Sequence, residues 1–199
     1  MVDCFEVIKE NVRALINDET QSVAHRMDHM QRVTANALEI ASHYPDADLE
    51  LLRLAALLHD VCQPFDRKDE HVDLSVKAAR KILEEVCYPP DRAEKVLRII
   101  SEHSTENMDR RPTTIEAKIL FDADKLDGLG ASGIARVFAL FGQKGKTPLE
   151  AVPWYLHKME MARENMQTEK GRRMAKERAR YVIEFLEKIK EENRININV

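Results

Sequence analysis

The sequence predicts an all-helical protein, and two observations support this. Only six glycines and seven prolines interrupt the 199 residues, so long stretches can remain in regular structure. Apolar residues recur at helical spacing along most of the chain, whereas the apolar–polar alternation typical of strands is hard to find. A chain of this length is sufficient for one domain with a sizeable core.

The first three helices follow from apolar periodicity and from the residues that stop it. We expect a short amphipathic helix over residues 3–17. A second should run from about Ser22 to Tyr44, where Pro45 prevents continuation. Asp48 can cap the third, which should end near Cys62.

The remaining helices are predicted in the same way. Two should occupy residues 71–86 and 91–104. Thr113 and Glu116 have the spacing of a capping box, which would start the helix that carries Asp124. Glycines 128 and 130 should end or kink that helix before another over residues 131–142. Two long helices, roughly 148–166 and 168–191, finish the chain and should pack on the same core through the apolar stripe of the last one.

Composition and charge exclude several classes of protein. A net charge of −4, with 33% charged residues, argues against a general nucleic-acid binder. No stretch approaches the length of a membrane span, and the N-terminus does not resemble a signal peptide. Cys4, Cys62 and Cys87 are odd in number and lack CxxC spacing, so we expect free thiols and a cytoplasmic protein.

A polar pair ends the most apolar run of the chain, the segment LLRLAALLHD at 51–60. Burying His59 and Asp60 without partners would cost several kcal/mol, about 2–7 for a neutral polar group and more for a charge. A bound divalent cation would satisfy both. Histidines 25 and 29, and the acids of FDADKLDGLGASGIAR at 121–136, offer further ligands in helical context. Imidazole and carboxylate without thiolate suit Mn, Fe, Co, Ni, Mg or Zn with positions left open for water.

This order of His, His-Asp and Asp resembles the signature of the HD superfamily of metal-dependent phosphohydrolases. The resemblance includes the local contexts HMQRV (29–33), AALLHDV (55–61), HVDLS (71–75) and ADKLD (123–127). It implies an HD-domain helical bundle forming a single domain over 1–199, with a motif-bearing core at about 22–142 and a helical extension at about 148–191. It also implies one divalent cation held by four side chains: His29, His59, Asp60 and Asp124.

The resemblance leaves a second ion open. His71 lies where two-metal members place a second-metal ligand, and His103 lies near the position of another. Two-metal members usually have adjacent histidines there, and this chain has Glu102 in place of the first. We therefore expect a single ion, with His71 contacting substrate phosphate and His103 acting as an acid.

Other candidates lie beside the ligand motifs. Lys125, Arg32 and Arg136 could neutralise a phosphate, and the alternative for each is a surface ion pair. His25 could orient His29 or contact substrate, and the alternative is a solvent-exposed histidine. Asp122 is interpreted as a hydrogen-bonding group behind the ligands, and His43 and His157 as structural or surface residues.

The expected chemistry is hydrolysis by a metal-activated water that Asp60 orients, with Lys125 and His103 assisting. Similarity to small stand-alone HD proteins, including the ASGIAR segment at 131–136, implies a small-molecule nucleotide substrate and pyrophosphate release from nucleoside triphosphates. Phosphomonoesterase or cyclic-nucleotide phosphodiesterase action is the first alternative. A non-catalytic nucleotide or metal sensor and a helical scaffold with a buried polar network are the others. No nucleic-acid or membrane partner is expected, and a homodimer is left open.

Overall fold

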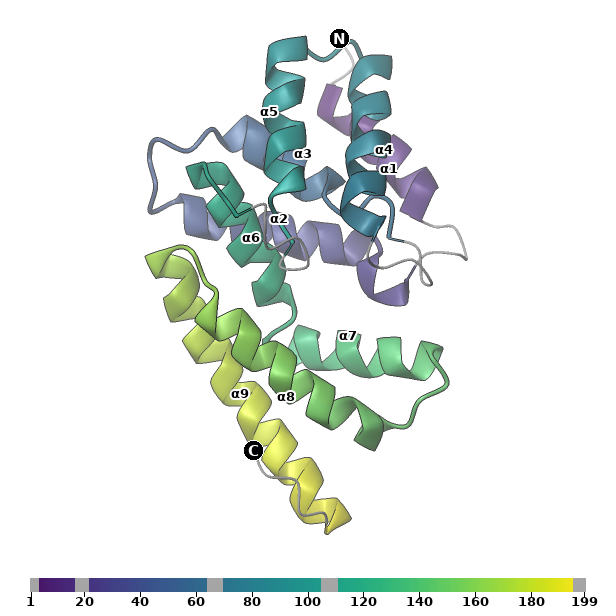
Figure 1. Cartoon of the computed structure of the whole chain (residues 1–199), viewed down its shortest axis with the longest axis vertical. Coiled ribbons are helices and arrows are strands. Elements are labelled where there is room, and N and C mark those ends of the chain that lie inside the picture. The colour runs from purple at the N-terminus through teal and green to yellow at the C-terminus, as the bar shows by residue number, and fades with distance from the viewer. Residues whose placement is uncertain (1–3, 17–21, 64–69, 105–110, 195–199) are drawn as a thin grey trace.

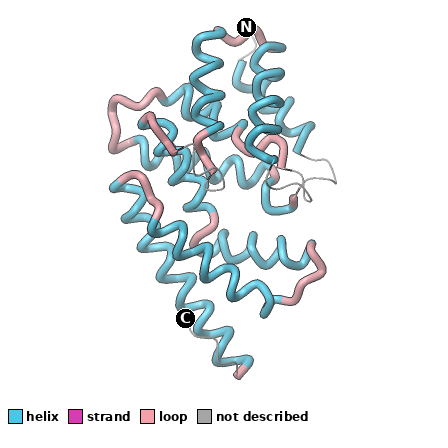
Figure 2. Tube along the Cα trace, in the orientation of Figure 1, coloured by secondary structure: helices cyan, strands magenta, loops and turns pink. Residues whose placement is uncertain are grey.

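The computed structural model describes residues 4–16, 22–63, 70–104 and 111–194, and every regular element in these ranges is helical (Figures 1 and 2). The all-α prediction is confirmed. The elements in chain order are α1 (Cys4–Ile16), the 3-10 turn η1 (Val23–His25), α2 (Met27–Ala41), α3 (Leu49–Leu58), α4 (His71–Glu85), α5 (Pro90–Ser101), α6 (Ile115–Asp127), α7 (Gly130–Gln143), α8 (Pro148–Glu164) and α9 (Glu169–Asn193).

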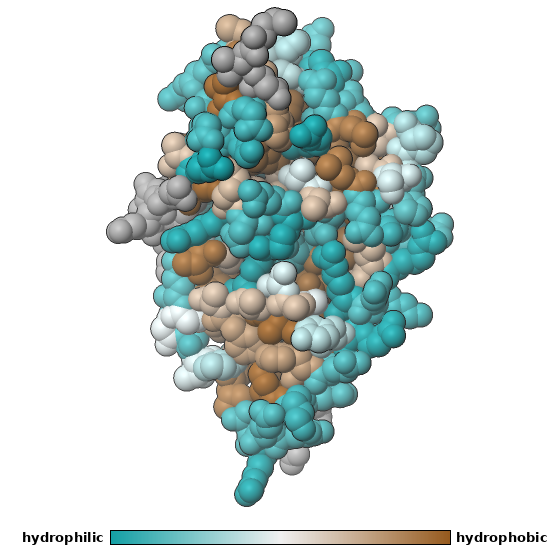
Figure 3. All heavy atoms as spheres, turned by 180° about the vertical axis from the view of Figure 1, so that it is seen from behind, coloured by the Kyte–Doolittle hydropathy of each residue, from teal (hydrophilic) through white to brown (hydrophobic). Residues whose placement is uncertain are grey.

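The helices share one continuous apolar core that draws residues from α1 through α9. Helices α2 and α6 pack against each other across the middle of the molecule, and α3 packs on both. Helices α4 and α5 stand side by side at the top of Figure 1, while α7, α8 and α9 form the lower part. Seen from behind, hydrophilic side chains cover most of the surface, with an apolar area in the lower half (Figure 3). The predicted packing of the two C-terminal helices on the common core is confirmed.

The second predicted helix is broken near its start. Residues 23–25 form the 3-10 turn, Arg26 is extended (φ −89°, ψ −177°), and α2 begins only at Met27. His25 and His29 therefore do not share a helix face as predicted, although their rings still meet edge to face with centroids 5.3 Å apart. The third helix also ends earlier than expected, at Leu58, which leaves His59 and Asp60 just beyond it. Both breaks turn polar side chains toward one point.

The helix starts show one correct and one wrong capping prediction. Asp48 caps α3, since its carboxylate accepts from two backbone N–H groups of the first turn at 3.1 Å. The capping box predicted for Thr113 and Glu116 is wrong. Thr114 is the N-cap of α6, with its hydroxyl accepting from a backbone N–H at 3.2 Å. Glu116 instead accepts from the backbone N–H of Asp48 at 2.9 Å, which ties α6 to α3.

Asp122 holds the C-terminal helices to the core, so its predicted place behind the metal ligands is wrong. Its carboxylate is fully buried and accepts from the backbone N–H groups of Gln167 and Thr168 at 2.7 Å and from the Thr168 hydroxyl at 2.6 Å. A Cβ at Gly171 would lie 2.2 Å from this carboxylate, so glycine is needed at that close approach. Within the described ranges, no helix has the length and apolarity to cross a membrane.

Candidate metal centre

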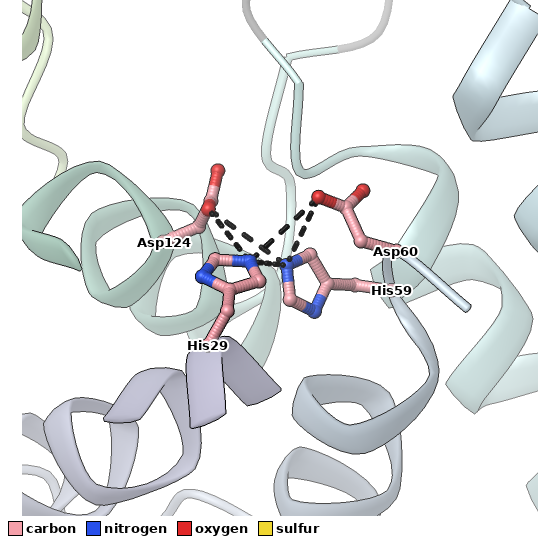
Figure 4. A group of neighbouring side chains, drawn as sticks. All are labelled: His29, His59, Asp60 and Asp124. Atoms are coloured by element: carbon pink, nitrogen blue, oxygen red, sulfur yellow. Dashed lines mark hydrogen bonds and ion pairs between the residues drawn. The ribbon is translucent and has the colours of Figure 1, made fainter. Parts of the chain in front are cut away.

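The four side chains chosen from sequence as ligands come together at the junction of α2, α3 and α6 (Figure 4). His29 belongs to the first turn of α2, His59 and Asp60 follow the end of α3, and Asp124 lies on α6. One donor atom from each lies within 4.8 Å of the other three. The two Nε2 atoms are 3.2 Å apart, and each is 3.7 Å from Asp60 Oδ2 and from Asp124 Oδ1. Metal–ligand bonds of about 2.0–2.2 Å separate adjacent donors by about 3–3.5 Å, so the set fits one ion with slight contraction.

The hydrogen bonds of the two imidazoles also fit a cation. His59 Nδ1 donates to the backbone carbonyl of Ala56 at 2.9 Å, and His29 Nδ1 lies 2.8 Å from Asp127 Oδ2. Because a carbonyl or carboxylate only accepts, each neutral ring keeps its proton on Nδ1 and directs a lone pair from Nε2. Two such lone pairs at 3.2 Å repel each other unless a cation or proton lies between them.

Charge around the site favours a cation as well. Burial lowers the pKa of His59, but the carboxylates of Asp60 and Asp124 outweigh it and raise that pKa above its ordinary value. Burial raises the pKa of Asp124, but Lys125 and the neighbouring histidines hold it well below the usual range. Both carboxylates are therefore charged at neutral pH in a buried site, which is the environment a divalent ion requires.

Asp127 accepts a hydrogen bond from His29 Nδ1, the ring nitrogen that points away from the other donors. Sequence reasoning did not predict this role. Asp127 is 1% exposed, accepts from His29 Nδ1 at 2.8 Å and Arg32 Nε at 2.7 Å, and forms an ion pair with Arg136 Nη1 at 2.7 Å. Burial raises the pKa of Asp127, but the His29 hydrogen bond and the two guanidinium groups lower it to about 2. A carboxylate on the outer nitrogen sets the tautomer and orientation of a ligand histidine. Its position three residues after Asp124, on a nearby helix face, was the available signal.

Both arginines predicted to bind substrate are engaged by this carboxylate. Arg32 also donates to Asp28 at 2.7 Å, and Arg136 Nε donates to the backbone carbonyl of Ala24 at 2.8 Å. Arg136 still lines the cavity described below, whereas Arg32 is not among the lining residues. The roles of Arg32 and Arg136 in substrate binding stay predictions. Their contacts with Asp127 show that both also hold this carboxylate in position.

A second group of donors shares Asp60. His103 Nε2 lies 3.4 Å and His71 Nε2 3.8 Å from Asp60 Oδ1, an oxygen that has no hydrogen-bond partner in the described part of the chain. His103 Nδ1 donates to the carbonyl of Ile100 at 2.6 Å, so its Nε2 lone pair also faces this point. These three side chains could hold an ion. The preference for a single ion stays a prediction.

Glu102, whose presence favoured one ion, does not face the site. Its buried carboxylate accepts from the Thr113 backbone N–H at 2.7 Å and hydroxyl at 2.9 Å, and from Arg98 at 3.1 Å. These bonds join the end of α5 to the residues before α6. The side chain is therefore structural, and His103 alone brings an imidazole from this segment to the site.

The two remaining candidates lie beside the donors. Lys125 Nζ donates to Asp124 Oδ2 at 2.7 Å and to the His103 carbonyl at 3.3 Å, which links α6 to the end of α5. His25 Nε2 is 3.9 Å from Asp60 Oδ2, and burial lowers the pKa of this imidazole well below its usual value. Its side chain is only 17% exposed, so the solvent-exposed alternative does not hold.

A cavity of about 330 Å³ opens from this group of donors toward α7 and α8. Asp60, His71 and Lys125 line its polar end. The part toward α7 and α8 is lined by residues that were not predicted as site residues: Leu140, Lys144, Trp154, His157, Lys158 and Met161. Of these, His157 was interpreted as a structural or surface residue. The volume is within the range of small-molecule pockets. No local pattern distinguishes these residues from ordinary helix positions, which is why they were missed.

Comparisons with known proteins agree with this geometry. The HD domain family model matches residues 26–129, just over half of the chain. The Bacillus subtilis protein YpgQ is 30% identical over 194 residues, covering 94% of this chain and 92% of YpgQ. The crystal structure of YpgQ in complex with ADP superposes with a TM-score of 0.75 and 29% identity, covering 96% and 97% of the two chains. A predicted HD superfamily hydrolase from an uncultured Thermotogales bacterium gives a TM-score of 0.64 and 31% identity over 93% and 90%. The four candidate ligands lie inside the matched segment, and this chain belongs to the HD domain family.

Proposed function

We propose that this protein is a metal-dependent phosphohydrolase that acts on nucleotides, and that it releases pyrophosphate from nucleoside triphosphates. The observation that supports this most is the position of Asp60. Its carboxylate lies between two groups of histidines and lines the cavity, as Lys125 does. Such an arrangement brings a cation, a phosphate oxygen and a water together.

The chain's own groups then have separate tasks. A divalent cation at His29, His59, Asp60 and Asp124 would supply Lewis acidity and lower the pKa of a coordinated water. Asp60 Oδ1 orients that water by accepting its hydrogen bond, because this oxygen has no other hydrogen-bond partner in the described residues. Lys125 places positive charge beside the reacting phosphate while its bond to Asp124 holds that ligand in position. His103 Nε2 faces the same oxygen at 3.4 Å with its lone pair, so it can take the proton of the attacking water and pass it to the leaving group.

A nucleotide fits the shape and charge of the cavity. The polar end matches phosphate, and the far end combines apolar side chains with two lysines. The binding of ADP by YpgQ in its crystal structure supports the same class of ligand for this relative of similar fold.

The test is a release assay with Mn²⁺, Co²⁺, Ni²⁺ or Mg²⁺ over nucleoside triphosphates, monophosphates and cyclic nucleotides. We expect equal amounts of nucleoside monophosphate and pyrophosphate from triphosphates. Asp60→Asn should lose this activity, whereas Asp46→Asn, at an exposed carboxylate before α3, should retain it. Phosphate release from monophosphates would replace the proposal with a phosphomonoesterase. Binding without turnover under every metal would replace it with a sensor.

A further inference from the structure

The only tryptophan of the chain lines the cavity from α8, whereas the candidate metal donors come from α2, α6 and the end of α3. Trp154 belongs to the second turn of α8, outside the segment that the family model matches. Its indole is half-buried. A large aromatic side chain that keeps one part exposed to a cavity is a common binding surface for a flat ligand group.

Packing holds this indole in place. The ring of Phe141, at the end of α7, lies 5.4 Å from it between centroids with an interplanar angle of 56°. Lys158 Nζ lies 5.8 Å from the ring centroid, within the range of a cation–π contact. Neighbours from two helices thus restrict the side chain, which lowers the entropy lost when a ligand group stacks on it.

The other residues at this end indicate what the ligand group is. Leu140 and Met161 give the wall an apolar surface, and Lys144 and Lys158 add hydrogen-bond donors. A hydrocarbon group would not use the donors. A nucleobase is planar and also carries nitrogen and oxygen acceptors at its edge, so it matches both features.

We propose that Trp154 is the stacking surface for the base of the nucleotide, and that α7 and α8 form a base subsite separate from the metal donors. This inference rests on the proposed function for the identity of the substrate class. It assigns substrate selection to α7 and α8 and phosphate chemistry to α2, α3 and α6.

Because Trp154 is the only tryptophan, its fluorescence reports on this subsite directly. The full-length protein with Mg²⁺ is titrated with ADP, inorganic pyrophosphate and ribose 5-phosphate, with correction for absorption by the base. ADP should quench the emission saturably, and the other two should leave it unchanged. Equal quenching by ribose 5-phosphate would assign the wall to a sugar and overturn the base subsite.

Variants test the same point by calorimetry. Trp154→Leu should weaken ADP binding by about tenfold, the size expected for one base stacked on an aromatic ring, and leave pyrophosphate binding unchanged. Trp154→Phe keeps an aromatic face and should restore most of the affinity. Tyr181→Leu, at an exposed aromatic on α9 outside the cavity, is the matched control.

The outcomes separate this inference from the proposed function. If nucleotides are hydrolysed and Trp154→Leu, folded as judged by its melting curve, binds ADP like the wild type, the base subsite is wrong. If no nucleotide is hydrolysed but ADP still quenches the emission, the base subsite stands and the proposed function is wrong. Equal weakening of ADP and pyrophosphate binding in Trp154→Leu would also overturn the inference, because it would indicate general damage to the cavity.

Discussion

Replacing Asp127 with asparagine tests how the chain holds His29, the first candidate ligand. The side chain keeps its shape but loses the charge that pairs with Arg32 and Arg136 at 2.7 Å and orients His29 at 2.8 Å. A hydrogen bond to a charged group contributes about 1.5–3 kcal/mol. The arginine side chains are 30% and 14% exposed, so water offsets part of the loss. We expect a loss of about 2–3 kcal/mol in the free energy of unfolding, or about 4–12 °C in Tm.

The same variant should lose metal affinity, because His29 could then rotate or change tautomer. A loss of about 10- to 100-fold is typical when the group behind a metal-binding histidine is removed. Chelator competition with Mn²⁺ or Co²⁺ measures the affinity, and thermal unfolding measures the stability. Asp28→Asn is the control, since Asp28 is 64% exposed and contacts the same Arg32. Unchanged metal affinity in a folded Asp127→Asn protein would refute the orienting role.

Protonation of Asp127 should reduce the stability of the fold only at low pH. The folded-state pKa of Asp127 is lowered to about 2, below its unfolded value of about 3.9. Its stabilising contribution is therefore complete above about pH 4 and is lost as pH falls toward 2.

Three other results are expected. His59→Ala should abolish metal binding and metal-dependent turnover while the far-ultraviolet circular dichroism stays helical; full metal content in this variant would exclude His59 as a ligand. His71→Ala and His103→Ala should each lower turnover with metal stoichiometry near one, and a fall from two ions to one by elemental analysis would instead establish the second site. Asp122→Ala should destabilise the protein by about 2–4 kcal/mol in urea unfolding, because several donors around Thr168 lose a buried acceptor, while the metal stoichiometry is unchanged.

The fold and the donor set were accessible from sequence because local patterns carry them. Apolar spacing predicted the helices, and the resemblance to the HD signature selected the four residues that meet at one point: His29, His59, Asp60 and Asp124. The break at Arg26 was missed because no proline or glycine marks it. Ser22 did give a local signal, since its hydroxyl caps the 3-10 turn at 3.3 Å.

Contacts between distant segments could not be predicted in the same way. Helical periodicity correctly directs Asp122 away from Asp124, but the donors it meets lie at 167–168, and no spacing rule connects them. Trp154 is similar. A tryptophan on an amphipathic helix is usually part of the core, and only the packing of α8 on α7 brings this one to the cavity.

Helix α6 carries Asp124 on one side and Asp122 on the other, and this has a consequence for where the chain can be cut. The segment matched by the family model, 26–129, contains both acids but not Thr168. A fragment ending there would lack α8 and α9, so the apolar side chains of the common core that pack on these helices would become exposed to water, together with the Asp122 carboxylate. Leaving one large apolar side chain exposed costs about 1.5–3 kcal/mol, so a few of them equal the whole stability of a small domain. The segment that the family model matches is therefore smaller than the segment that folds cooperatively. We expect the metal centre to form only when the C-terminal helices α8 and α9 are present.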